Sequence, residues 1–308
     1  FKEWLQYDTM PDMTTFPGTV VNGIDTTNLA TNMVNDVDHT IQSLVFDYNA
    51  SYQDLATTRI SYIAGSNLAQ IYGVVNPNGL VTLGAERTGI FSRAAFLAKQ
   101  AQPATSPVKR GRFMLTSVLC QSIGNPPPGA PAQAPPLDPG VFYTTRDRYN
   151  LLTVQDKNGV PVSSCVGCHS RMNPLGYVYE SFDPFGRVRS SEPVTSTVNG
   201  QPVTQNLPIN TQAVTSELDT ANVSMGSYMD LHQYLATSDK ALACMSQQWF
   251  KYLEKRAPAT ASFDGCYMNE FLNTAYGTST SGHMGGQGAI KDVIKKTVLS
   301  TRFKTWNN

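Results

Sequence analysis

The chain has 308 residues, with 23 basic and 23 acidic side chains, so its formal net charge at pH 7 is zero. This length suits about two domains with sizeable cores, and the charge balance excludes a strongly basic nucleic-acid-binding protein. No apolar run approaches the roughly 18 residues of a transmembrane helix. We therefore expect neither a nucleic-acid partner nor a transmembrane segment.

The first part of the chain reads as a series of helices. Residues 28–47 carry apolar side chains at helical spacing behind an Asn or Thr cap. The predicted elements that follow are two shorter helices in 51–73, a turn and short strand in 76–83, and helices at 93–101 and 110–121. The basic cluster of Lys109, Arg110 and Arg112 is expected to be a solvated helix start. Residues 1–124 are therefore predicted to form an N-terminal helical domain.

A proline-rich stretch interrupts this pattern. Residues 125–139 read "NPPPGAPAQAPPLDP", a composition that favours an extended, semi-rigid chain. We therefore place a linker at 125–140.

The most informative motif comes next. Cys165, Cys168 and His169 have the C-x-x-C-H spacing of a c-type haem attachment site. At positions i, i+3 and i+4 of a helix, the three side chains point the same way. Two thiols can then bond the haem vinyl groups as thioethers while the imidazole binds iron. The spacing predicts one covalently attached haem c with His169 as the proximal ligand.

A redox C-x-x-C pair and half of a zinc site are the alternatives. A zinc site needs a second pair of ligands, whereas Cys120, Cys244 and Cys266 stand singly in the sequence. Cys244 and Cys266 flank a predicted helix and a loop, so we expect a disulfide between them. Cys120 is then left free, either as a buried small hydrophobe, which we favour, or as an exposed crosslinker.

The compartment follows from the same residues. Haem c is attached outside the cytoplasm, where disulfides also persist. Phe1 is not an initiator residue, so an upstream segment is expected to have been removed. We expect an extracytoplasmic protein, located in the periplasm, on the cell surface or in the medium.

The rest of the chain contains one hairpin and further helices. Alternating Val and Thr around Asn199-Gly200 predict a two-residue β-hairpin over 194–206. Helical periodicity returns in 225–256 and 288–306, and glycine-rich residues 277–288 read as a linker. Five apolar side chains of the last helix are expected to face inward: Ile290, Val293, Ile294, Val298 and Leu299. The predicted fold is mainly α, with residues 141–222 as the haem-attachment segment and 223–308 as a C-terminal helical domain that completes the haem pocket.

Several motifs occur in a fixed order: "ERTGIFSRAAFLA", "SPVKRGRFML", "CVGCHSRMNPLGYVYESFDPFGRVR", "CMSQQWFKYLEKR" and "FDGCYMNEFL". In this set and order the chain resembles the secreted cytochrome-like proteins of planctomycetes and myxobacteria, which are built from three consecutive domains of unknown function. The resemblance implies a c-type cytochrome and does not supply a reaction. Asn173 stands where that family usually has aspartate, and Glu254-Lys255 replaces a glycine-containing step.

Residues near the motif are candidates for holding the haem. The segment "NPLG" resembles the turn after the haem helix in small cytochromes c, where a proline carbonyl accepts the proximal imidazole N–H. Pro174 is expected either to play that part or only to end the helix. Arg187, together with Arg171 and Arg189, is a candidate partner of the haem propionates, the alternative being a solvated side chain.

The sixth iron ligand decides between functions. Met225 lies sixty residues after Cys165, just ahead of a predicted helix, and small cytochromes c place their axial methionine similarly. Met172 is too close to His169, and Met229 and His232 are the other candidates. A methionine ligand raises the potential and favours electron transfer, whereas an open position permits peroxide or oxygen chemistry. An ordinary core methionine is the alternative role of Met225.

These observations predict an extracytoplasmic monohaem cytochrome c that transfers single electrons to or from a redox partner protein. One alternative is a haem-dependent peroxidase or oxygenase with an open distal site. Another is a haem-bearing subunit of an extracellular assembly, which implies self-assembly.

Overall fold

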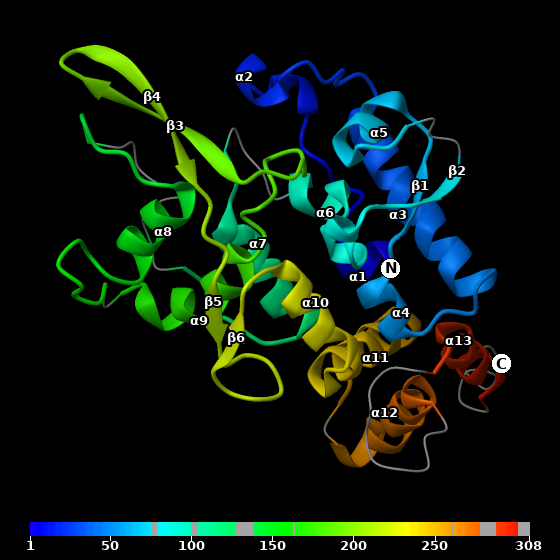
Figure 1. Cartoon of the computed structure of the whole chain (residues 1–308). Coiled ribbons are helices and arrows are strands. Elements are labelled where there is room, and N and C mark those ends of the chain that lie inside the picture. Colours follow the sequence, from blue (N-terminus) through cyan, green and yellow to red (C-terminus); the bar gives the residue numbers. More distant parts are fainter. Residues whose placement is uncertain are drawn as a thin grey trace.

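The computed structural model describes residues 1–75, 79–99, 104–126, 128, 138–162, 164–259, 261–277 and 288–300. Helices dominate it (Figure 1), and the strands of these residues form three two-stranded antiparallel sheets. The mainly α fold predicted from the sequence is confirmed. None of the helices in the described ranges is long and apolar enough to cross a membrane.

The first hundred residues fold around one long helix. Their helices are α1 (Lys2–Leu5), α2 (Gly18–Val21), α3 (Leu29–Phe46), α4 (Tyr52–Thr57), α5 (Ser66–Tyr72) and α6 (Ala94–Lys99), and their strands are β1 (Ile60–Ile63) and β2 (Gly79–Thr82). As predicted, α3 buries an apolar stripe that includes Leu29, Met33 and Val37. Strand β1 interrupts the stretch predicted to hold only two helices. Its residue Tyr62 donates its backbone N–H to Asp36 and Thr40 of α3, and β1 pairs with β2.

In the segment between residues 107 and 208, two helices from different parts of the chain cross at close range. The helices and strands here are α7 (Pro107–Phe113), a π-helix over Met114–Val118, α8 (Thr145–Thr153), α9 (Val166–Tyr177), β3 (Ser191–Val198) and β4 (Gln201–Pro208). A Cβ on Gly111 would lie 1.9 Å from the carbonyl oxygen of Met172, and one on Gly176 would lie 1.8 Å from that of Pro107. Only glycine at both positions lets α7 and α9 approach this closely. This crossing fixes the position of the helix that carries the C-x-x-C-H motif.

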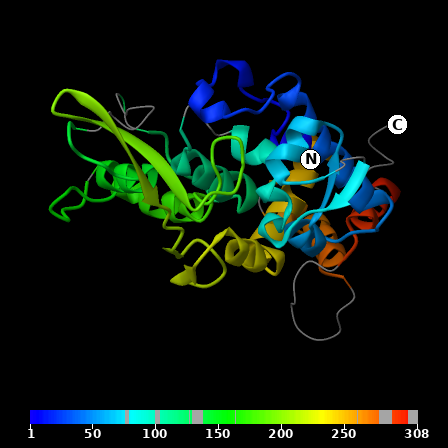
Figure 2. The ribbon, with the colours of Figure 1, turned by 45° about the horizontal axis from the view of Figure 1, so that its top comes forward.

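The predicted hairpin is present. Strands β3 and β4 pair over their full length, and Asn199 and Gly200 form the turn with φ angles of 50° and 78°. Two successive positive φ values are what the predicted Asn-Gly turn requires. The hairpin projects from the body of the molecule (Figure 2).

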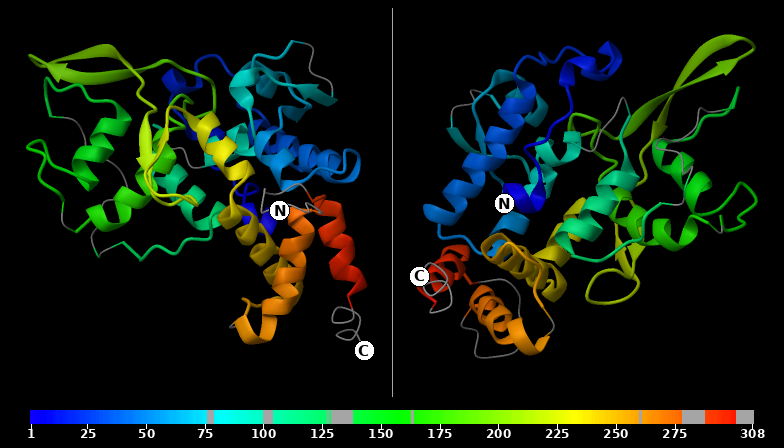
Figure 3. Two further views of the ribbon diagram at one scale, coloured as in Figure 1. Left: turned by 60° about the horizontal axis from the view of Figure 1, so that its bottom comes forward. Right: turned by 180° about the vertical axis from the view of Figure 1, so that it is seen from behind.

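The C-terminal part consists of β5 (Ala213–Thr215), β6 (Val223–Met225), α10 (Tyr228–Ala236), α11 (Asp239–Glu254), α12 (Ala261–Tyr276) and α13 (Ile290–Leu299). Figure 3 shows α11, α12 and α13 side by side near the N-terminus. Ile290 and Val293 are buried as predicted, but Val298 and Leu299 are exposed. The inward orientation expected for those two residues is wrong, because the buried face of α13 continues through Thr297, and Val298 and Leu299 lie to the side of that face.

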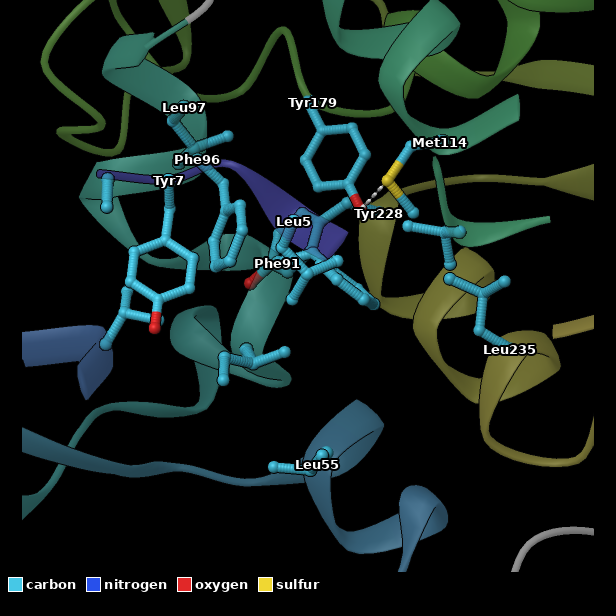
Figure 4. Packing of buried hydrophobic residues seen from close by; sticks show 14 of the residues in the cluster. Leu5, Tyr7, Leu55, Phe91, Phe96, Leu97, Met114, Tyr179, Tyr228 and Leu235 are labelled. Carbon is cyan, nitrogen blue, oxygen red and sulfur yellow. Dashed lines mark hydrogen bonds between the residues drawn. The ribbon is translucent and has the colours of Figure 1, made fainter. Parts of the chain in front are cut away.

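The hydrophobic core is shared by segments that lie on both sides of the predicted linker. Figure 4 shows Tyr7, Phe91 and Phe96 of the first part in the same cluster as Tyr179 and Tyr228. Most of the proposed linker at 125–140, and most of the glycine-rich stretch at 277–288, lies outside the described residues. The division into domains therefore stays a prediction.

The basic cluster at the start of α7 is not simply solvated. The helix begins as expected, but Arg110 is buried and forms an ion pair with Glu180, their nitrogen and oxygen 3.5 Å apart. Its guanidinium also donates to the carbonyls of Tyr179 and Phe182. Burial lowers the pKa of Arg110 to about 10. The expectation of a solvated cluster is wrong for this residue, which ties α7 to the chain beyond α9.

The predicted disulfide is also wrong. Cys120 is bonded to Cys244, with their Cα atoms 5.3 Å apart, and Cys266 is a free, exposed cysteine. Cys244 lies on the buried face of α11, where its sulfur is near Ser117 and Cys120. Cys266 lies on the exposed side of α12, a helix that begins within the stretch predicted to be a loop before Cys266. Because the two helices present these cysteines to different surroundings, the short-range pairing does not form.

Candidate haem attachment site

The structure brings Cys165, Cys168 and His169 together at the first turn of α9. Cys165 is the N-cap residue, and its carbonyl accepts the backbone N–H groups of Cys168 and His169 at 3.2 and 3.1 Å. All three side chains are half-buried, and both thiols are free. The geometry of this turn is the one assumed for the C-x-x-C-H motif.

The imidazole of His169 is held by one specific partner. Its Nδ1 lies 3.0 Å from Oδ1 of Asn173, one helical turn further along α9. Burial lowers the pKa of His169, and this hydrogen bond opposes the shift. No hydrogen bond to Nε2 is present among the described residues. A neutral imidazole with a tethered Nδ1 and an available Nε2 suits an axial iron ligand.

This donor set fits haem c better than zinc. Haem c needs two free thiols and an imidazole at this spacing, and all three are present. A structural zinc site needs four ligands, but Cys120 and Cys244 are bonded to each other in a disulfide and cannot bind zinc. Within the described residues, no group of three or more His, Cys, Asp or Glu side chains is arranged to hold a metal ion.

Asn173 was not among the predicted site residues. Its side chain is fully buried, and its Nδ2 lies 3.1 Å from both Thr153 Oγ1 and Tyr177 OH. The available signal was its position four residues after His169, because side chains at i and i+4 of a helix are neighbours.

Pro174 lies inside α9, which continues to Tyr177. It therefore does not end the helix, the simpler of its two expected roles. In the structure Nδ1 of His169 bonds to the side chain of Asn173 rather than to the Pro174 carbonyl.

The three candidate arginines all have protein partners. Arg187 pairs with Asp183 and donates to the carbonyls of Val20 and Val21. This places the Arg187 guanidinium against the α2 segment. Arg171, on α9 itself, forms two hydrogen bonds with Glu217, and Arg189 pairs with Glu180 and Glu192.

The candidates for the sixth ligand differ in their surroundings. Met225 is the last residue of β6, and it is buried opposite Ala213 of β5. Strand β5 lies against α9, so Met225 is on the strand next to the one that packs against the helix of His169. Met229 is 43% exposed on α10. His232 is fully buried, and its Nε2 is 2.7 Å from the Tyr179 hydroxyl.

The fold and the site together define a mainly α-helical protein whose C-x-x-C-H motif opens a helix held by close packing. Comparison with known families then shows that residues 87–192 match the family described as "PSCyt3: Protein of unknown function (DUF1588)". The match runs from the segment before α6 to the start of β3 and contains the whole motif. It relates this part of the chain to a cytochrome c-related family. Neither the curated proteins nor the solved structures contain a match to the chain.

Proposed function

We propose that the protein is an extracytoplasmic c-type haem protein that transfers single electrons. The observation that carries the proposal is the first turn of α9, where two free thiols and a neutral imidazole stand at haem c spacing. The Cys120–Cys244 disulfide supports the compartment, because such bonds persist outside the cytoplasm.

Each residue of the turn has one task. The thiols of Cys165 and Cys168 would form the two thioether bonds, and Nε2 of His169 would donate its lone pair to iron. When bound, the haem supplies an iron that cycles between the ferric and ferrous states. The protein supplies the orientation of the imidazole, through Asn173, and a helix whose position is fixed by its crossing with α7.

Met225 is our candidate for the sixth ligand. Its place on β6, beside the strand that lies against α9, supports this assignment. A thioether is neutral and soft, so it favours ferrous iron and raises the potential. Of the other candidates, His232 already uses Nε2 in its contact with Tyr179, and Met229 is on the exposed side of α10.

Haem retention after acid extraction tests the proposal. Acidified acetone should remove no haem from the wild-type chain, because both vinyl positions are bonded to protein. The double variant Cys165→Ala, Cys168→Ala should lose all of its haem, whereas Cys266→Ser should behave like the wild type. Complete extraction from the wild type would refute covalent attachment.

The optical spectrum of the ferric protein tests electron transfer against haem enzyme chemistry. A six-coordinate, low-spin spectrum with a methionine signature in the near infrared supports the electron carrier. A high-spin ferric spectrum would instead identify an open distal position, as a peroxidase or oxygenase requires.

A further inference from the structure

The hydrogen bonds behind His169 form a chain with a defined direction. It begins at Thr153, the last residue of α8, whose hydroxyl donates its hydrogen to the carbonyl of Tyr149 at 2.6 Å. A hydroxyl has one hydrogen to donate. Thr153 Oγ1 can therefore only accept from its second neighbour, the Asn173 side chain 3.1 Å away.

This constraint orients the amide of Asn173. Its NH₂ group must face Thr153, and the same group also reaches the Tyr177 hydroxyl at 3.1 Å. The amide oxygen consequently faces His169, 3.0 Å from Nδ1. An amide oxygen only accepts hydrogen bonds, so Nδ1 carries the proton. The lone pair of the imidazole then lies on Nε2.

The burial of Asn173 makes this arrangement hard to reverse. The side chain has no exposed surface, so water does not replace a lost partner. Turning the amide over would place its oxygen against Thr153 Oγ1, whose hydrogen is already donated to the Tyr149 carbonyl. That contact would be lost, and unpaired buried polar groups are strongly disfavoured.

We infer that Asn173 is a positioning residue that sets His169 in the iron-binding tautomer and tunes the potential of the haem iron. This inference rests on the function proposed above. Asn173 is a neutral acceptor, so it withdraws the Nδ1 proton only weakly. A carboxylate in its place would draw that proton more strongly and make the imidazole a better electron donor. Such a ligand stabilises ferric iron and lowers the potential.

The tautomer is tested first, on the wild-type full chain, both free of haem and, where haem is bound, in the ferrous form. Nitrogen-15 NMR of the His169 ring should show the proton on Nδ1, with slow exchange against solvent. A proton on Nε2, or rapid exchange of the Nδ1 proton, would overturn the inference. This reading needs no variant, and it applies whether or not the chain carries haem.

The potential is tested in variants of Asn173. Asn173→Asp should shift the redox equilibrium toward ferric iron by about tenfold, which is 59 mV for a one-electron couple. Asn173→Leu should raise the potential and abolish slow exchange of the Nδ1 proton. Thr153→Val should speed that exchange by removing the acceptor that orients the amide. The matched control is Ser170→Ala, whose exposed hydroxyl bonds, among the described residues, to the Val166 carbonyl on the same helix alone. It should change neither the potential nor the exchange of the Nδ1 proton.

The outcomes separate this inference from the proposed function. If haem is covalently present and Asn173→Asp keeps the wild-type potential, the tuning role is refuted and the proposed function stands. If the wild type carries no covalent haem, the proposed function fails. The ring tautomer then still decides whether Asn173 positions His169.

Discussion

His169 and His232 lie in two regions of the molecule that differ in how far they bury the imidazole and in which ring nitrogen they bond. His169 is half-buried at the start of α9, its Nδ1 held by a neutral amide. His232 lies in a closed aromatic cluster, edge to face with Phe91 and Tyr228, and its Nε2 contacts the Tyr179 hydroxyl. Figure 4 shows part of this cluster. The comparison indicates that packing, and not residue type, decides which imidazole is available to a metal.

The same difference extends to the glycines beside each histidine. A Cβ on Gly89 would lie 2.0 Å from Nδ1 of His232 and 2.2 Å from the carbonyl of Ala56. A Cβ on Gly167, inside the C-x-x-C-H motif, would have no neighbour within 4 Å. The region around His232 has no spare room, whereas the start of α9 is open on one side.

Of the substitutions considered, Met225→Ala should have the largest effect on stability and on the optical spectrum. Truncating a buried methionine costs about 2–5 kcal/mol of unfolding free energy, and the variant should convert a low-spin spectrum into a high-spin or water-ligated one. Met229→Ala should leave the unfolding free energy and the spectrum nearly unchanged, because that side chain is exposed. Denaturant unfolding and optical spectroscopy measure the two effects. A native spectrum in Met225→Ala would place the ligand elsewhere and reopen the case for His232.

Gly89→Ala should be the next most damaging change. The new methyl group would overlap His232 and the Ala56 carbonyl, and Gly89 has a φ of 78°, which disfavours alanine. We expect a loss of about 2–3 kcal/mol, within the range for an overpacked core. Gly167→Ala is the control. It should cost nothing and can gain about 0.5–1 kcal/mol from helix propensity. Equal stabilities of the two variants would contradict the contrast between the regions.

The unfolding free energy should depend on pH in a way that reflects the buried imidazole of His232. Burial is the main cause that lowers its pKa from 6.5 to about 3. Below pH 6.5 the unfolded chain binds a proton that the folded chain does not bind until about pH 3. Stability contributed by the neutral imidazole is therefore complete above pH 6.5 and is lost as the pH falls. The loss is about 1.4 kcal/mol per pH unit, or about 2 kcal/mol at pH 5.

Comparing variants isolates this contribution from those of buried carboxyl groups. His232→Gln should flatten the slope of unfolding free energy against pH between 6.5 and 5. His39→Gln, which alters an exposed histidine on α3, should keep the wild-type slope. An unchanged slope in His232→Gln would show that the buried imidazole takes up its proton as readily as in the unfolded chain.

Arg171→Ala should have the smallest effect on the unfolding free energy. Its two hydrogen bonds with Glu217 connect α9 to the loop after β5, but the arginine side chain is 35% exposed. Partly exposed ion pairs contribute roughly 0.2–1 kcal/mol, so urea unfolding should register a change in that range. A loss as large as that of Gly89→Ala would mean that α9 depends on this pair for its position.

Local patterns in the sequence predicted the local features of the fold. The spacing of apolar residues predicted α3, and the Asn199-Gly200 pair predicted the β3–β4 turn. The C-x-x-C-H spacing placed Cys165, Cys168 and His169 on one helical turn. Each signal lies within a few residues of the structure that it predicts, so no distant contact was needed to interpret it.

Long-range contacts explain what the sequence did not reveal. The disulfide joins residues 124 positions apart, and nothing near Cys120 indicates that α11 passes beside it. Arg110 is buried beside Glu180, 70 residues later, which the crossing of α7 and α9 brings to it. The role of Asn173 depends in the same way on Thr153, which belongs to α8.

Peptide mapping by mass spectrometry tests the central claim most directly. The denatured, digested chain should give one peptide, containing Cys165 and Cys168, that carries the mass of one haem. In the same digest, Cys120 and Cys244 should appear as a disulfide-linked pair, which confirms that the native protein was analysed. Recovery of the Cys165–Cys168 peptide without added mass would contradict the account.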